Sequence, residues 1–430
     1  MNDDEFKDTE IGRIPKEWEI KKLSQLIEYK KGKTPKKVIK EYKEKCLPYL
    51  STEYLRENKI TTFVEEHQNV VLVNDDDIIL LWDGSNAGEF FLGKQGILSS
   101  TMVKIDLKEN NNKKFLFYIL KMNEDYFKRN TKGTGIPHVD KNILLDFTIP
   151  LPPLEEQQKI AYVLSKIQKA IELQDRLIKL LQELKKTMMH KLFTEGIGHT
   201  EFKDTEIGRI PKEWEIKKLL EIAELQRGLS YSGKEKSVNE ILEGYLFLTL
   251  NSIKEGGGLK EDGWTWIKSD RLKERHFVRE GDIVIANTDI GMQRGHILGA
   301  PAIVHFPEWY KKDKVVFSMD LSKLLLRISN IDVNFLFYYL SFVQPLARKY
   351  HTGTNVWHMN LDSWAKDLLI PFPPLEEQKK ISNILLTIDN KISLEENRKD
   401  LLEKLFKTML NKLMTGQIRV KDLNVEVFGV

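Results

Sequence analysis

The stretch EFKDTEIGRIPKEWEIKKL, residues Glu5–Leu23, occurs a second time without any change as residues Glu201–Leu219, and we call these two stretches the opening repeats. Two further pairs of matching segments follow in the same order: Ile149–Ile160 (IPLPPLEEQQKI) with Ile370–Ile381 (IPFPPLEEQKKI), and Lys186–Leu192 (KTMMHKL) with Lys407–Leu413 (KTMLNKL). The segments between the first and second pair, which we call the middles, share little sequence. This pattern predicts a duplicated chain whose edges do one job twice and whose middles do two different jobs.

Composition narrows the class of protein. With 430 residues, 41% hydrophobic and 30% charged, the chain has room for two or three domains with cores of their own. No apolar run approaches the roughly 20 residues that span a bilayer, and the acidic start is unlike a signal peptide. The single cysteine, Cys46, excludes an intramolecular disulfide and a cysteine-based zinc site. We therefore expect a cytoplasmic protein.

A long helix is predicted in each half, over about 40 residues without an internal proline or glycine. Apolar residues recur there at a spacing of three and four: Ile160, Leu164, Ile167, Ile171, Ile178, Leu181, Met188 and Leu192, and again Ile381, Leu385, Ile388, Ile392, Leu402, Phe406, Met409 and Leu413. Gln174, Lys185, Glu395 and Lys399 interrupt this stripe. We expect the helices to pair antiparallel as a coiled coil; the alternative is that each packs separately on its own domain.

The middles, residues 24–148 and 220–369, mix short strands with helical pieces. Strands are predicted at Val70–Val73, Asp77–Trp82, Gly281–Ala286 and Asp320–Ile328, and matching aromatic helices at Phe115–Leu120 and Phe335–Leu340. Irregular alternation of strands and helices favours an α+β fold with a largely antiparallel sheet. The predicted domains are residues 1–149, 150–198 (first helix), 199–370 and 371–430 (second helix and tail). The tail after Gly416 is expected to return to the first opening repeat, making the molecule pseudo-two-fold symmetric.

Basic residues concentrate in the middles and are the candidates for contacting nucleic acid. Net charge is only +3, so the distribution of charge matters more than its sum. Lysine and arginine in loops suit phosphate contacts, and arginine and asparagine can read base edges; a solvated charged face would look similar. The candidates are Lys31, Lys33, Thr34, Lys36 and Lys37 in the first middle, and Arg227, Lys234, Arg271, Arg275, Asn287 and Arg294 in the second.

The residues offer no convincing catalytic or metal site. Gly228–Lys234 resembles a phosphate-binding loop, but Glu235 stands where such a loop needs serine or threonine, so we interpret it as a chance match. No nuclease, methyltransferase or dinucleotide-binding motif is complete. His138 and His358 occupy equivalent places and are interpreted as parts of structural turns. We expect any catalysis to belong to a partner.

Opening repeat, variable middle, Pro-Pro-Leu-Glu-Glu-Gln and long helix, all given twice, resemble the specificity subunit of type I restriction–modification systems. The resemblance covers essentially the whole chain and is most specific at Pro150–Gln157 and Pro371–Gln378. Gly32–Pro35 (GKTP) and Gly281–Ile285 (GDIVI) also match the family. The first copy departs at Asp75–Ile79, where the glycine is replaced, and the second at Arg227–Ser230, which lacks Thr-Pro.

The resemblance implies two target-recognition domains, each reading one half of a split, asymmetric site in double-stranded DNA. It implies two methyltransferase subunits docked on the repeated regions, and restriction subunits joining them. S-adenosylmethionine, Mg²⁺ and ATP would act on those partners, with none bound by this chain. The candidate partner-binding residues are Leu154, Glu155, Gln157, Leu375, Glu376 and Gln378. The alternatives are a stand-alone nuclease or methyltransferase with an unrecognised site, and a coiled-coil scaffold without DNA binding.

Overall fold

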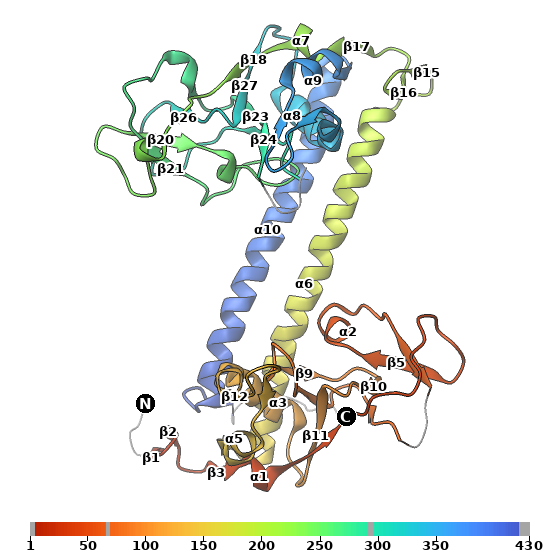
Figure 1. Cartoon of the computed structure of the whole chain (residues 1–430), viewed down its shortest axis with the longest axis vertical. Helices are drawn as coiled ribbons and strands as arrows, with labels where there is room; N and C mark the ends of the chain where they lie inside the picture. The colour runs from red at the N-terminus through yellow and green to blue at the C-terminus, as the bar shows by residue number, and fades with distance from the viewer. Residues whose placement is uncertain (1–4, 66–68, 291–295, 421–430) are drawn as a thin grey trace. The chain divides into compact units, whose positions relative to one another are not determined.

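The computed structural model describes residues 5–65, 69–290 and 296–420. The chain forms two compact units: unit 1 consists of residues 1–176 and 396–430, and unit 2 of residues 177–395. Their borders lie inside the two longest helices, so each unit contains part of both (Figure 1). Each unit is therefore built from both copies of the repeat.

The two long helices have the lengths that the sequence predicts. Helix α6 (Leu154–Thr194) has 41 residues and α10 (Leu375–Met414) has 40. Each begins directly after a Pro-Pro pair and carries two glutamates in its first turn, where the helix dipole stabilises negative charge. Shortly after each helix, a glycine adopts the left-handed conformation, Gly196 at φ +65° and Gly416 at φ +70°, as is common at helix C-termini.

In unit 2 the two helix segments run antiparallel. Lys185 Nζ in α6 lies 2.6 Å from Asp389 Oδ1 in α10. Beyond the end of α6, the backbone N–H of Ile197 donates to Glu377 Oε1 at 3.0 Å. As the residue number rises along the first segment, the residue number of its partner in the second segment falls, which is the pattern of antiparallel pairing. Lys185, which interrupts the apolar stripe, forms an ion pair between the helices.

Unit 1 shows the same arrangement with the other ends of the helices. Lys399 Nζ lies 2.7 Å from Asp175 Oδ1, and this hydrogen bond raises the pKa of Lys399 above its ordinary value. Further along, Arg419 Nε donates to Glu156 Oε1 at 2.7 Å. The predicted antiparallel pairing is confirmed within each unit, and Lys399, the other lysine that interrupts the stripe, again forms an interhelical ion pair.

The third strand of each opening repeat pairs with the strand that leads into a long helix. In unit 1, β3 (Glu19–Lys22) pairs antiparallel with β14 (Thr148–Leu151), and in unit 2, β17 (Glu215–Lys218) pairs with β30 (Leu369–Phe372). The two edges of each middle are thus neighbours in space, which explains why they are repeated together. The other elements that begin in the opening repeats are β1 (Phe6–Thr9), β2 (Gly12–Pro15) and α1 (Leu23–Leu26), and β15 (Phe202–Thr205), β16 (Gly208–Pro211) and α7 (Leu219–Ile222).

The two middles share one scaffold despite their different sequences. Each has a four-stranded antiparallel sheet, ordered β4-β11-β8-β9 in unit 1 and β18-β27-β23-β25 in unit 2. The strands are β4 (Ile27–Lys31), β8 (Ile78–Leu81), β9 (Phe90–Leu92) and β11 (Met102–Leu107), and β18 (Ala223–Arg227), β23 (Ile283–Ala286), β25 (Pro301–Ile303) and β27 (Leu321–Leu326). The strands predicted around β8, β23 and β27 are confirmed.

A second sheet accompanies the first in each unit, ordered β6-β5-β10-β7 in unit 1 and β19-β21-β20-β26-β22 in unit 2. One pair in each is parallel, β5 with β10 and β20 with β26. The strands are β5 (Cys46–Leu50), β6 (Phe63–Glu65), β7 (Leu72–Val73), β10 (Gly96–Leu98), β19 (Lys236–Ser237), β20 (Tyr245–Leu248), β21 (Thr265–Ile267), β22 (Phe277–Val278) and β26 (Val315–Phe317). The predicted α+β class with largely antiparallel sheets is confirmed, although β7 is shorter than the predicted Val70–Val73.

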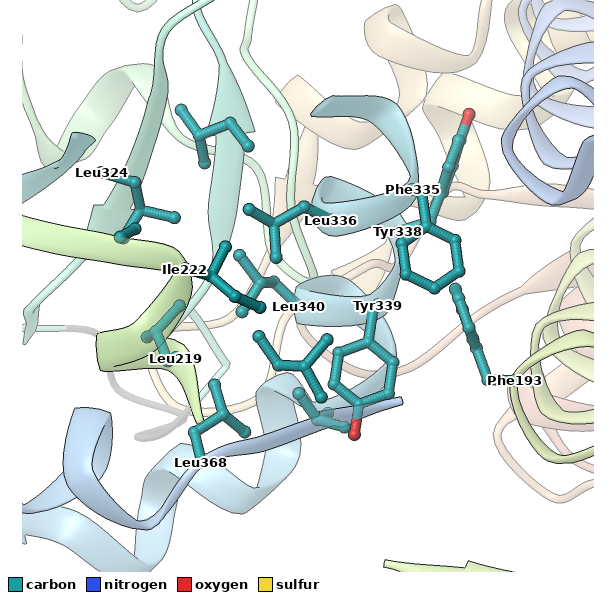
Figure 2. Close-up of a cluster of buried hydrophobic side chains, with 14 of the residues drawn as sticks. Phe193, Leu219, Ile222, Leu324, Phe335, Leu336, Tyr338, Tyr339, Leu340 and Leu368 are labelled. Carbon is teal, nitrogen blue, oxygen red and sulfur yellow. The ribbon is translucent and has the colours of Figure 1, made fainter. Parts of the chain in front are cut away.

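The aromatic helices belong to the cores, as predicted. Helix α8 (Val333–Val343) packs in unit 2 against Phe193 of α6, whose ring lies 5.6 Å from Phe335 and 5.3 Å from Tyr339 (Figure 2). In unit 1, Tyr118 of α3 (Lys113–Met122) contacts Phe406 of α10, with ring centroids 5.9 Å apart. The remaining helices are α2 (Thr52–Glu57), α4 (Glu124–Arg129), α5 (Lys141–Asp146) and α9 (Leu361–Asp367).

Candidate nucleic-acid interface

In unit 1, one edge of the four-stranded sheet carries a cation and a small hairpin. Lys31 ends β4, and its Nζ lies 2.8 Å from Asp83 Oδ2, just beyond β8. Asp83 forms a bridge with the hairpin of β12 (Thr131–Lys132) and β13 (His138–Val139). The turn predicted around His138 is therefore a hairpin attached to the sheet edge on which Lys31 lies.

Unit 2 repeats this arrangement with different residues. Arg227 ends β18 at the place of Lys31, and the hairpin consists of β28 (His351–Thr352) and β29 (Trp357–Met359). The short strand β24 (Thr288–Asp289) pairs with β29, and Thr288 Oγ1 lies 3.2 Å from His358 Nδ1. The predicted residues Lys31 and Arg227 thus occupy equivalent places near two equivalent hairpins.

A glycine follows each of these cations for a steric reason. A Cβ on Gly32 would lie 2.0 Å from the carbonyl oxygen of Ser99, and a Cβ on Gly228 would lie 2.3 Å from that of Phe317. No other residue fits such a close backbone approach without a shift. Arg227–Gly228 is therefore equivalent to Lys31–Gly32, although the missing Thr-Pro hides the match in the sequence.

Asn287 needs a correction. Its side chain is only 6% exposed, and its Nδ2 donates to the carbonyl of Met319 at 2.9 Å, while its own carbonyl accepts from the backbone N–H of Met359 at 2.7 Å. An amide held inside the domain is not presented to a base edge. Asn287 instead connects the end of β23 to the hairpin and to the loop before β27, so its predicted base contact is replaced by a positioning role.

The lysine-rich loop after β4 is open to solvent. Lys33, Thr34, Lys36 and Lys37 are all exposed, and within the described ranges no carboxylate lies in ion-pair distance of the three lysines. Unsatisfied cations on a loop beside the hairpin are available for phosphate contacts. DNA contact by these four residues stays a prediction, and their exposure agrees with it.

Three further candidates of the second middle are exposed, and two of them also form bonds within the unit. Lys234, Arg271 and Arg275 are all exposed, while Arg271 Nη2 lies 2.6 Å from Glu235 Oε2 and Arg275 Nε donates to His276 Nε2 at 3.2 Å. Hydrogen bonds from Ser269 and from the Ser232 backbone, with Arg271 adding to them, lower the pKa of Glu235 to about 2. A carboxylate fixed in this way would repel a phosphate, which supports the interpretation of a chance loop match. Arg294 lies outside the described residues.

The glutamines of the Pro-Pro-Leu-Glu-Glu-Gln motif act inside their units. Gln157 Oε1 accepts from the backbone N–H of Asn112, the N-cap of α3, and Gln378 Oε1 accepts from that of Asp332, the N-cap of α8. Both glutamines are buried. Each ties a long helix to the aromatic helix of its middle, so the predicted partner contact stays with the four other residues: Leu154 and Leu375, which are half-buried, and Glu155 and Glu376, which are exposed.

The glutamate before each glutamine was missed by sequence reasoning. Trp18 Nε1 donates to Glu156 Oε2 at 2.9 Å, and Trp214 Nε1 donates to Glu377 Oε2 at 3.0 Å. Both indole rings are fully buried. The only signal in the sequence was that the two tryptophans and the two glutamates recur together. These bonds fix each opening repeat on the start of a long helix.

Each unit also exposes a matched set of leucines on its helix segments. Unit 1 exposes Leu401 and Leu405 of α10, and unit 2 exposes Leu180 and Leu184 of α6, which occupy the same two positions of the repeat. A third repeat position is exposed as Leu173 in unit 1 and as Leu394 in unit 2. These leucines lie outside the cores and recur at equivalent positions in both copies, which makes them candidates for contact with a partner.

Two properties of the described residues bear on the class of protein. Across 5–65, 69–290 and 296–420, no helix combines the length and the hydropathy needed to cross a membrane. In the same part of the chain, no group of three or more histidine, cysteine, aspartate or glutamate side chains is arranged to hold a metal ion.

Comparison with known proteins agrees with this organisation. The family model described as the type I restriction modification DNA specificity domain matches twice, at residues 15–183 and 211–404. The chain is 39% identical over 428 residues to the type I restriction enzyme MjaVIII specificity subunit of Methanocaldococcus jannaschii, covering 98% of each chain. It is 30% identical to the putative MjaX specificity subunit of that organism, covering 97% of this chain and 98% of the relative.

A solved structure shows the same fold. The crystal structure of the type I restriction–modification S subunit from M. genitalium aligns with a TM-score of 0.58 at 17% identity, covering 92% of this chain and 96% of that chain. Its match in fold accompanies the two family-model matches, one for each half of the repeat. The chain belongs to the type I restriction–modification specificity subunits, the DNA-recognition components of these restriction enzymes, and carries two target-recognition domains.

Proposed function

We propose that each recognition domain reads one half of a split, asymmetric DNA site. The observation that carries this proposal is the likeness of the two middles at one edge of their four-stranded sheets. Each has a cation and a hairpin at equivalent places there, but the loops nearby differ between the two middles. In unit 1 the loop between β4 and β5 is rich in lysine, whereas unit 2 places Lys234, Arg271 and Arg275 on separate segments. One scaffold with two unlike reading surfaces suits two different half-sites.

Two copies of a methyltransferase subunit are the proposed partners of the repeated regions. The opening repeats are identical in sequence, and the exposed leucines recur at the same repeat positions in both units. One kind of partner can therefore bind each unit through the same contacts. Restriction subunits would join this complex, and S-adenosylmethionine, Mg²⁺ and ATP would be used by these partners in the cytoplasm, where the DNA is.

The shared helices are proposed to set the spacing between half-sites. Half-sites one turn of DNA apart are separated by roughly 34–36 Å. Helix α6, at about 1.5 Å per residue, is long enough to act as a spacer of this size. Changing the spacer of the DNA site by one or two base pairs is then expected to abolish specific binding.

The test is methylation by the assembled complex. This chain, co-purified with its methyltransferase subunits, is incubated with genomic DNA and S-adenosylmethionine, and the methylated positions are mapped. The expected result is one split motif with unlike halves and a constant spacer. Methylation or cleavage by this chain alone would show a stand-alone enzyme, and sequence-independent DNA binding by the assembled complex would show a scaffold; either outcome overturns the proposal.

A further inference from the structure

The two hairpins at the sheet edges are a repeated element inside middles that have otherwise diverged. Thr131–Val139 reads TKGTGIPHV, and His351–Met359 reads HTGTNVWHM. Both contain Gly-Thr at the turn and histidine in the second strand. The second strand of each hairpin pairs with the segment that follows an inner strand of the four-stranded sheet, β8 in unit 1 and β23 in unit 2. The features that the two hairpins share cannot be what distinguishes two different half-sites.

The tip of each hairpin is built for exposure. Gly133 and Gly353 adopt φ values of +101° and +89°, which favour glycine, and a Cβ on either would collide with a carbonyl oxygen of its own turn. The residues after them are open to solvent, and the Ile136 side chain is 71% exposed. From these segments the cores take Val139 and Met359, with Trp357 partly buried against the core of unit 2, and all three lie in the second strands of the hairpins, after the tips. The tips therefore do not serve packing.

Positive charge lies beside each hairpin at equivalent positions. Arg129 is exposed two residues before the first hairpin, and Lys349 is exposed two residues before the second. A second equivalent pair is Lys31 and Arg227, at the strand ends on the same edges. Nearby carboxylates offset part of this charge, since Asp83 pairs with Lys31 and Asp140 pairs with Lys132.

The type of cation is exchanged between the two units while the charge is kept. Arginine in one unit stands where lysine stands in the other, at both positions. A phosphate oxygen accepts a hydrogen bond from either group, and phosphates occur in every half-site whatever its sequence. A positive charge that is kept at equivalent positions in two domains with unlike half-sites therefore suits a contact with phosphate.

We infer that the two hairpins bind the DNA backbone of each half-site without reading its sequence. Arg129 and Lys349 provide the charge, and the glycine-threonine turns provide a backbone that a phosphate can approach closely. This inference rests on the proposed function for the position of the DNA. The recognition surface then has two parts. The hairpins contact the DNA backbone in the same way in both units, and the loops differ between the units.

The experiment uses the complex of the full chain with its methyltransferase subunits and measures the Kd for duplexes with and without the target site over a range of salt concentrations. Each lost phosphate contact is expected to lower the slope of log Kd against log salt by about 1. The double variant R129A/K349A should therefore lower the slope by about 2 on both duplexes. The ratio of the two Kd values should stay the same.

The charge-exchanging double variant R129K/K349R is the matched control and should restore the slope. An unchanged slope in R129A/K349A would show that the hairpins are only structural. A changed methylation motif would assign them to base reading, and loss of the methyltransferase subunits from the complex would assign them to protein docking; each of these results overturns the inference. Loss of sequence preference in the unaltered complex would instead refute the proposed function, while the slope on non-specific DNA still tests the hairpins.

Discussion

Three segments of the chain meet at the carboxylate of Glu156, and three meet at the carboxylate of Glu377. Glu156 accepts hydrogen bonds from Trp18 of the first opening repeat and from Arg419 of the tail, and the bond to Glu156 raises the pKa of Arg419. Glu377 accepts from Trp214 and lies 2.9 Å from His199 Nε2, in the segment after α6. The predicted return of the tail to the first opening repeat is confirmed by these contacts.

Removing the Glu156 carboxylate should destabilise unit 1 strongly. Glu156 is 5% exposed, so Glu156→Ala leaves both the indole N–H of Trp18 and the guanidinium of Arg419 without their shared acceptor. Breaking such a buried pair costs about 3–5 kcal/mol. Urea unfolding of the variant measures this loss, and Glu156→Gln should lie between the variant and the unaltered protein. A loss of less than about 1 kcal/mol would contradict the assigned role.

Asp77 should make unit 1 sensitive to acid. Burial alone would raise its pKa, but hydrogen bonds from Lys113, the Asn74 backbone and Lys104 outweigh burial and hold the pKa of Asp77 below its ordinary value. A depressed folded-state pKa gives stability that is present above an ordinary carboxyl pKa of about 4 and is lost as pH falls through the lower folded value.

Asp77→Asn therefore should lower the free energy of unfolding by about 1–3 kcal/mol at neutral pH and flatten its decline in acid. Urea unfolding at several pH values between neutrality and acid checks this. Asp282→Asn, which removes the equivalent ion pair with Lys323 in unit 2, is the comparison. Parallel acid declines of Asp77→Asn and the unaltered protein would contradict the assignment.

At the scale of elements, the long helices were predictable and the shared scaffold of the middles was not. An apolar period without internal proline or glycine, bounded by proline before it and glycine after it, specifies α6 and α10 almost completely. In the middles, different residues satisfy the same backbone: Asp76 adopts φ +66° at the turn before β8, where Gly281 adopts φ +82° before β23. A sequence comparison shows this aspartate as a departure from the family's glycine, although the turn is the same.

The exposed leucines of the helices allow a direct test of partner docking. Leu180→Asp with Leu401→Asp alters the same repeat position in both units, and a charge on a docking surface must be desolvated or left unpaired when the partner binds. We expect at least a tenfold weaker assembly with methyltransferase subunits, measured by analytical ultracentrifugation. Leu242→Asp, at an exposed loop position, is the control and should assemble normally. Equal assembly of all variants would exclude this surface.

For the molecule as a whole, the candidate site could be predicted only in part. The exposed loop lysines and the strand-end cations Lys31 and Arg227 were found from charge alone. Asn287 and the two motif glutamines were misplaced on the surface because burial depends on contacts between segments far apart in the sequence. The hairpins were recognised from the sequence only as equivalent structural turns around His138 and His358, because they carry little charge of their own.

Exchange of one middle should change one half of the DNA site. The edges of each middle meet as paired strands, β3 with β14 and β17 with β30, so a foreign middle has to fit only at that junction. Replacing residues 24–148 with the corresponding segment of another family member should alter one half of the methylated motif and leave the other half and the spacer unchanged. A change in both halves would show that the domains do not read independently.

The division of the helices between the units also orders the folding of the nascent chain. The core of unit 1 includes Leu413, Met414 and Val420, which are synthesised after the whole of unit 2. Unit 2 consists of the continuous segment 177–395 and has all of its residues earlier. Although domains generally fold in the order of synthesis, the core of unit 1 can close only after residues 413–420 have been made, so translation that stops between unit 2 and these residues leaves the first domain, and not the second, with an open core.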